Sequence, residues 1–157
     1  MLGKLLSLRA FVVRTANALS WVPLTAARLA LGWVFVQSGW GKLHNLPQVV
    51  EYFTSLGIPA PSLQAPFVAG VELVGGVFLL GGLFTRVVSV PLAMTMVVAL
   101  LTAKRADIAS AGDLYGTVEF LYLLGFGTLA AFGAGFLSLD EILVRRFAPA
   151  PGTPGSD

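Results

Sequence analysis

The chain has 157 residues, of which 56% are hydrophobic and 11% are charged, and its mean hydropathy is +0.83. Soluble domains carry about 25% charged residues, so this composition excludes an ordinary soluble protein and indicates an integral membrane protein. The net charge of +2 comes from scattered Lys and Arg residues, which argues against nucleic-acid binding. Cysteine is absent and His44 is the single histidine, which excludes thiol chemistry and iron–sulfur clusters, and no metal site is predicted.

Residues 1–20 are apolar but are interrupted by Lys4, Arg9 and Arg14. A signal peptide has an unbroken apolar centre, so these charges argue against one. We predict a short amphipathic helix lying at the membrane interface, with its basic side chains at the anionic lipid surface. A disordered start of the chain is the alternative.

Four apolar segments follow, each close to the about 20 residues that a helix needs to cross a bilayer. They cover residues 21–41, 63–84, 87–103 and 114–136. Trp21 and Trp40 are spaced as interfacial anchors at the two ends of the first segment. The sequence therefore predicts an all-α, integral membrane four-helix bundle over residues 21–147.

Basic residues at the ends of these segments predict the orientation of the bundle. Six lie on one side and three on the other: Lys4, Arg9, Arg14, Arg86, Arg145 and Arg146 against Lys42, Lys104 and Arg105. Cytoplasmic segments carry the excess of Lys and Arg, so both termini are predicted to be cytoplasmic (N-in, C-in).

Two segments outside the spans have distinct patterns. The outer loop, residues 42–62, has apolar residues at Val49, Val50, Tyr52, Phe53 and Leu56, which predicts a short amphipathic helix or re-entrant piece ending at Gly57. The tail, residues 148–157, is rich in Pro and Gly and is predicted to be disordered.

Three ionisable residues interrupt the apolar segments: Arg28, Glu72 and Glu119. A charge at the bilayer centre costs roughly 2.5–3.5 kcal/mol on insertion scales, so such residues are expected to face the bundle interior. Helical depth, at about 1.5 Å per residue, predicts a buried Arg28–Glu72 pair with Glu119 above it, near Tyr115 and Tyr122. That pair would serve either to organise a pocket or to fix the helix register.

One arginine against two glutamates leaves a surplus carboxylate, and burial favours its protonated form. We therefore predict Glu119 as a proton donor or acceptor, and a structural hydrogen bond between helices is the equal alternative. Lys42 and His44 lie just beyond the first segment, where they would either close a pocket mouth or lie solvated near lipid headgroups.

Several short motifs together resemble the DoxX family of small bacterial four-helix membrane proteins. They are an early Arg28, G-x-x-K-L ending the first helix at Gly39–Leu43, an aromatic-x-x-x-G-I-P loop from Phe53 to Pro59, E-x-x-G-G from Glu72, and G-L-x-T-R ending at Arg86. The resemblance covers roughly residues 22–140. It implies a multi-pass protein of the bacterial plasma (inner) membrane, associated with oxidoreductase complexes, since the family is named after a subunit of a thiosulfate:quinone oxidoreductase.

Three functional hypotheses follow from the sequence. In the first, the protein is a membrane subunit of a quinone-linked oxidoreductase that docks a soluble or peripheral partner and houses a quinone beside Arg28, Glu72, Tyr115, Tyr122, Lys42 and His44, with Glu119 handling the proton. In the second, it is a non-catalytic membrane anchor or assembly factor. The third, a small-solute or proton transporter, is weakened because the sequence shows neither inverted repeats nor a pair of broken helices. The small-residue faces also allow a homodimer.

Overall fold

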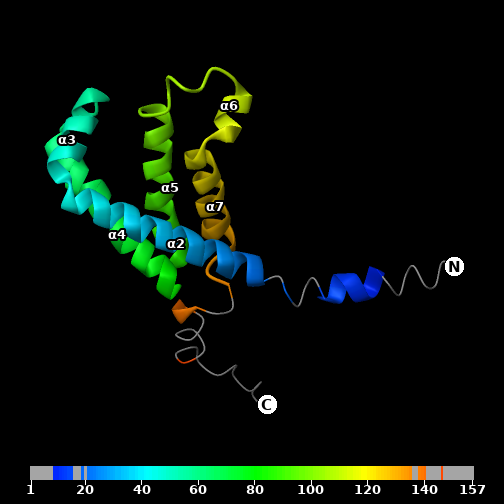
Figure 1. The fold of residues 1–157 in the computed structure, drawn as a ribbon. Helices are drawn as coiled ribbons and strands as arrows, with labels where there is room; N and C mark the ends of the chain where they lie inside the picture. The colour runs from blue at the N-terminus through cyan, green and yellow to red at the C-terminus, as the bar shows by residue number, and fades with distance from the viewer. Residues whose placement is uncertain (1–8, 16–18, 20, 136–137, 141–145, 147–157) are drawn as a thin grey trace, which may run out of the picture.

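The computed structural model describes residues 9–15, 19, 21–135, 138–140 and 146, and all regular secondary structure in those residues is helical (Figure 1). The labelled helices are α2 (Trp21–His44), α3 (Leu46–Ser55), α4 (Pro61–Gly81), α5 (Thr85–Leu101), α6 (Ala111–Gly116) and α7 (Val118–Phe132). Residues 9–15 are also helical and exposed, and the membrane-interface position predicted for them stays a prediction. The remainder of residues 1–20, apart from Leu19, and the tail at 148–157 lie outside the described residues.

The first three predicted apolar segments correspond to α2, α4 and α5, and the predicted loop helix is α3. The fourth segment differs, because the structure divides it into α6 and α7 at Thr117. Thr117 is extended (φ −79°, ψ 140°), and its hydroxyl accepts a hydrogen bond of 3.3 Å from the backbone N–H of Phe120. This side-chain cap gives α7 a start of its own, one residue before Val118.

Helices α2 and α4 cross in close contact at glycines (Figure 1). A methyl group on Gly76 would lie 2.6 Å from the backbone nitrogen of Val36, and one on Gly32 would lie 3.0 Å from the carbonyl oxygen of Gly76. Gly39 lies equally tightly against the backbone of Leu73. Backbones can approach this closely only where side chains are absent, so these glycines set the register between the two helices.

Helix α5 packs along α7, and α4 joins α5 through a tight turn. Gly82 ends α4 in the left-handed conformation (φ +65°), which glycine adopts without strain. Between the helix pairs, Phe35 of α2 contacts Phe126 of α7 edge to face, with ring centroids 4.8 Å apart. The same buried apolar core contains Leu31, Leu79, Leu92, Met96 and Leu129.

Large apolar side chains also cover the outside of the helices, among them Trp33, Leu63, Val74 and Leu121, each more than half exposed. Soluble monomers rarely expose continuous apolar surface, so this surface fits a lipid environment. Within the described residues, α4 is the helix long and apolar enough to cross a membrane by itself, and α5 and α7 are apolar but shorter.

Candidate functional site

Glu72 lies in the middle of α4, and its side chain is 2% exposed. The Ser38 hydroxyl donates a hydrogen bond of 2.8 Å to Glu72 Oε2, and Lys42 Nζ forms an ion pair with the same carboxylate. Ser38 and Lys42 lie one turn apart on one face of α2, which the glycine contacts hold against α4. The carboxylate is therefore charge-compensated from one neighbouring helix.

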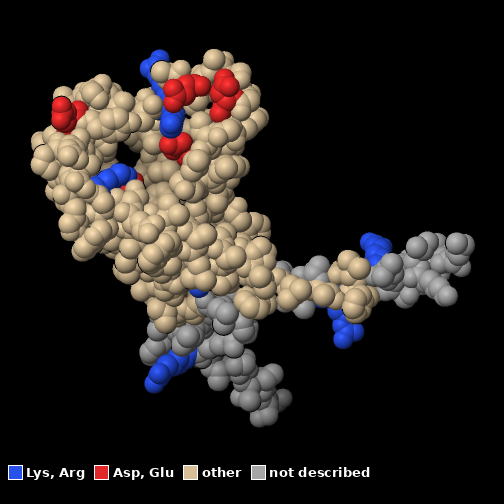
Figure 2. Space-filling view, in the orientation of Figure 1, with Lys and Arg blue, Asp and Glu red and all other residues tan. Residues whose placement is uncertain are grey.

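This cluster forms part of the wall of a cavity of about 950 Å³. The walls come from α2, α3, α4, α5 and α7, and most of the lining side chains are apolar or aromatic. Figure 2 shows its mouth as a dark hollow beside α3, with basic and acidic atoms inside it. Ligand pockets typically enclose about 300–1,000 Å³ with a few polar groups that fix orientation, and this cavity has both properties.

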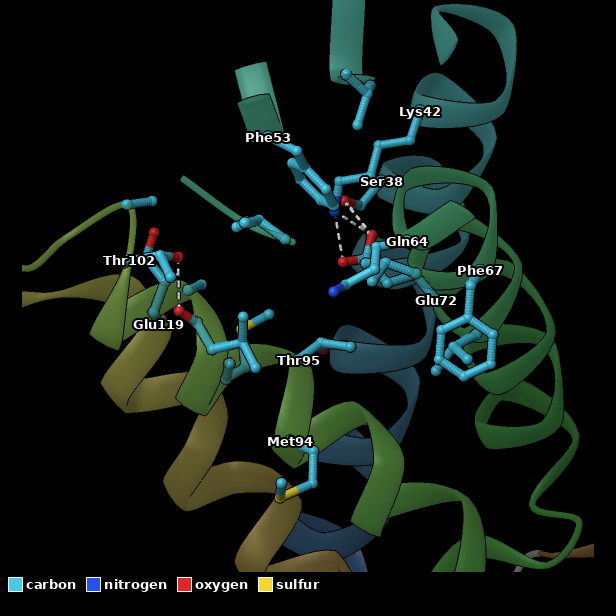
Figure 3. A pocket seen from close by; sticks show the side chains of 18 of the residues that line it. Ser38, Lys42, Phe53, Gln64, Phe67, Glu72, Met94, Thr95, Thr102 and Glu119 are labelled. Atoms are coloured by element: carbon cyan, nitrogen blue, oxygen red, sulfur yellow. Dashed lines mark hydrogen bonds and ion pairs between the residues drawn. The ribbon is translucent and has the colours of Figure 1, made fainter. Parts of the chain in front are cut away.

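Glu119 lines the same cavity from the first turn of α7, and Tyr122 lies one turn further on. Figure 3 shows Glu119 next to Thr102 on one side of the cavity and the Glu72, Lys42 and Ser38 cluster on the other. Glu119 is half-buried, whereas Glu72 is buried. The cavity thus holds one carboxylate paired with a lysine and a second one on the opposite wall, with Tyr122 near it.

Helix α3 covers the cavity at the end where α2 stops. Its apolar residues Val49, Tyr52, Phe53 and Leu56 line the cavity, although none of the residues of α3 is fully buried. The helix turns back at Gly57, which has a φ of +69°. The amphipathic pattern of the sequence is therefore explained by one face of α3 closing over the cavity.

The family model of DoxX matches residues 24–105. The chain belongs to the DoxX family. A Bacillus subtilis relative named "Putative oxidoreductase CatD" is 34% identical over 120 residues, which cover 75% of this chain and 84% of the relative.

A second DoxX-like relative is named "Uncharacterized membrane protein Rv3486", from Mycobacterium tuberculosis. It is 34% identical over 130 residues, which cover 76% of this chain and 80% of the relative. No solved structure matches the chain. The family assignment therefore rests on sequence, and the site geometry comes from the structure of this chain.

The predicted Arg28–Glu72 pair is wrong. Arg28 is 3% exposed and donates a hydrogen bond of 3.0 Å to the carbonyl oxygen of Ala134, beside the Gly82 turn at the far end of α4 from α3. The prediction counted depth along α2 from Trp21, as if α2 and α4 ended at the same level. In the structure the first two turns of α2 extend past the end of α4, so Arg28 lies further from Glu72 than that count implied. Lys42, which shares the helical face of Arg28, forms the ion pair with Glu72 instead.

Residues of the DoxX pattern therefore divide between two ends of the molecule. Lys42 and Glu72 line the cavity, whereas Arg28 and the G-L-x-T-R turn lie at the opposite end of α4. There, the Asp140 carboxylate accepts hydrogen bonds from the backbone N–H groups of Phe84 (2.8 Å) and Thr85 (3.2 Å) and caps α5. The second group of residues ties helix ends together and does not line the cavity.

Two other predicted site residues lie outside the cavity lining. Tyr115 of α6 is 62% exposed and its ring contacts Phe120. His44 is exposed, its Nδ1 is 2.9 Å from the carbonyl oxygen of Trp40, and its ring contacts the Trp40 ring. Both side chains lie on the exposed surface, outside the cavity. For His44 this position fits the alternative prediction, a solvated site near the lipid headgroups, better than a role in binding.

The structure adds site residues that the sequence prediction lacked. Ser38 binds Glu72 directly, and Gln64, Thr95 and Thr102 place further polar groups on the cavity wall. Ser38 was detectable, because it lies four residues before Lys42 on a helical face already identified. The others depend on how helices from separate parts of the chain face one another. No cluster of metal-ligand type occurs among the residues that the structure describes.

Proposed function

We propose that this DoxX-family protein crosses the bacterial plasma membrane four times, with both termini in the cytoplasm. The spans would be α2, α4, α5 and the fourth apolar segment, from Leu114 through α7. The exposed apolar side chains on these helices and the excess of basic residues at one end support this topology. Under it, α3 and the mouth of the cavity lie on the outer side of the membrane.

We further propose that the protein is a membrane subunit of a quinone-linked oxidoreductase system. The observation that carries the proposal is the mainly apolar cavity with Glu72 and Lys42 on one wall and Glu119 on the other. A quinone has a flat apolar ring with two carbonyl acceptors, and it supplies two-electron redox chemistry when bound. The apolar walls fit the ring, and Lys42 and Tyr122 supply donors for its carbonyl groups.

Each polar residue has a separate role in this proposal. Lys42 donates to one ring carbonyl, and its ion pair with Glu72 fixes its position, because the Ser38 hydroxyl also holds the Glu72 carboxylate. Tyr122 orients the opposite side of the ring. Glu119 would exchange protons with the bound ring, because it lines the opposite wall of the cavity from the first turn of α7.

Electrons would come from a soluble or peripheral partner. The chain has no cysteine and therefore no thiol or iron–sulfur relay of its own. The relative whose printed name is "Putative oxidoreductase CatD" supports an oxidoreductase system, and this chain would contribute the membrane-embedded part of it.

The test is quinone binding by the protein reconstituted in lipid nanodiscs, with a tail-less benzoquinone as the probe. Glu119→Gln and Tyr122→Phe are each expected to lower one of two measured quantities by about tenfold or more. The two quantities are the affinity for the quinone and the rate at which the co-purified partner reduces it. Glu51→Gln and Tyr115→Phe are matched controls, because neither residue lines the cavity. Absence of specific binding in the wild type would refute the proposal and favour the anchor hypothesis.

A further inference from the structure

Exposed residues border the cavity in two places of opposite chemistry, which we call its polar and apolar mouths. At the end near α3, its rim carries the polar side chains of Asn45, Gln48 and Thr102. Along the crevice between α4 and α5, its rim carries the apolar side chains of Phe67, Val90 and Met94. These last three are 67%, 55% and 56% exposed while also lining the cavity, which places them where the cavity meets the outer surface.

The apolar mouth exists because α4 and α5 meet at one end and diverge toward the other (Figure 1). They are in contact at Gly75, where a methyl group would lie 3.0 Å from the Leu92 side chain. Glu72, one turn from Gly75 toward α3, and Thr95, one turn beyond Leu92 on α5, both line the cavity. The crevice therefore opens beside the buried carboxylate, and Figure 3 shows Phe67 on the α4 side and Met94 on the α5 side.

Under the proposed topology the apolar mouth faces lipid acyl chains and the polar mouth faces water. An occupant that enters from the lipid through an apolar crevice and meets polar groups inside must itself be amphipathic. A water-soluble ligand would need only the polar mouth, and it would leave the apolar crevice without a role.

We propose that the crevice between α4 and α5 is a lateral portal for a lipid-tailed ligand. The head group lies beside Lys42 and Glu72, and the hydrocarbon tail leaves between Phe67 and Met94 into the bilayer. Resting on the proposed function, this inference specifies the ligand as a quinone with a long isoprenoid tail.

The test uses two probes in nanodiscs: a tail-less benzoquinone, and a long-tailed quinone with a photoreactive group in its tail. Mass spectrometry then maps the cross-links. Cross-links on α4 and α5 around Phe67 and Met94, reduced by excess tail-less quinone, would support the portal. Cross-links around Asn45 and Gln48 would place the tail in the polar mouth and would overturn the inference. It would also be overturned if excess tail-less quinone reduced none of the cross-links, because the portal would then have no specific occupant.

Met94→Trp tests the same point by narrowing the crevice. It is expected to lower affinity for the long-tailed quinone about tenfold while changing tail-less binding less than twofold. Val87→Trp is the matched control, since Val87 lies on the same helix, is 69% exposed and does not line the cavity. Equal effects of Met94→Trp on both probes would overturn the portal alone, whereas failure of both probes to bind the wild type would remove the proposed function and the portal with it.

Discussion

Replacing Lys42 with Met isolates the energetic role of the ion pair in the cavity. Glu72 is 2% exposed on its side chain, and removing one partner of a fully buried ion pair costs about 3–5 kcal/mol. Two features reduce this cost: the Lys42 side chain is 29% exposed, and the Ser38 hydroxyl still donates to Glu72 in the variant. We therefore expect a loss of about 2 kcal/mol in the free energy of unfolding.

The reciprocal change, Glu72→Met, should cost less, about 1 kcal/mol, because the partly exposed lysine can turn toward water while a buried carboxylate cannot. The double variant should recover part of the loss, since a well-packed apolar pair often replaces a buried ion pair without cost. For a chain of this length, about 2 kcal/mol corresponds to a decrease in Tm of roughly 4–8 °C.

The assay is thermal unfolding in a mild detergent for the two single variants and the double variant. Lys104→Met is the matched control, because its 3.5 Å pair with Asp107 is exposed (38% and 63% on the two side chains) and such pairs contribute about 0–1 kcal/mol. If Lys42→Met lowered the Tm no more than Lys104→Met, the conclusion that Lys42 compensates a buried charge would be wrong.

Three further changes test the packing, the capping and the acid sensitivity of the fold. Gly76→Ala should lower the free energy of unfolding by about 1–3 kcal/mol, because its methyl group would lie 2.6 Å from the Val36 backbone nitrogen; Gly70→Ala, with nothing within 4 Å, should be neutral or slightly stabilising in the same melt. Asp140→Ala should cost about 0.5–2 kcal/mol through loss of the α5 cap, seen as faster amide exchange at Phe84 and Thr85 and no change in quinone binding. Hydrogen bonds from the Ser110 hydroxyl and from the backbone N–H groups of Ser110 and Ala109 lower the pKa of Asp113 below its ordinary 3.8. This stabilisation is complete above the unfolded-state pKa and is lost as the pH falls through the lowered folded-state pKa, so amide protection in α6 should fall only under strongly acidic conditions, and Asp113→Asn should remove that dependence.

The sequence predicted which side of each helix faces the interior of the bundle, but it did not predict how far each helix is shifted along its neighbour. Periodicity placed Lys42 and Arg28 on one face of α2, and both do face inward in the structure. Which of them reaches Glu72 depends on how far α2 slides along α4, and the contact at Gly76 sets that distance. Glycine spacing allows several such registers, so the sequence alone offered no reason to prefer Lys42.

The division of the fourth segment depended on a weaker signal. Hydropathy continues across Thr117, and an apolar average therefore predicts one helix. The Ser110-x-x-Asp113 capping box and the Thr117 cap are short polar features that start helices in the structure. Such caps are common where no break occurs, so they become informative only when the surrounding contacts are known.

The Asp140 cap has a consequence for synthesis of the protein. Its carboxylate reaches backward by 55 and 56 residues to the start of α5, so that helix end keeps two unpaired N–H groups until the chain has been made past Asp140. Helices α2, α4 and α5 can enter the membrane in chain order, but the start of α5 is capped only after the C-terminal region has been translated. A chain stopped by a nonsense codon just before residue 138 would contain all the cavity residues and would still lack the carboxylate that caps the start of α5.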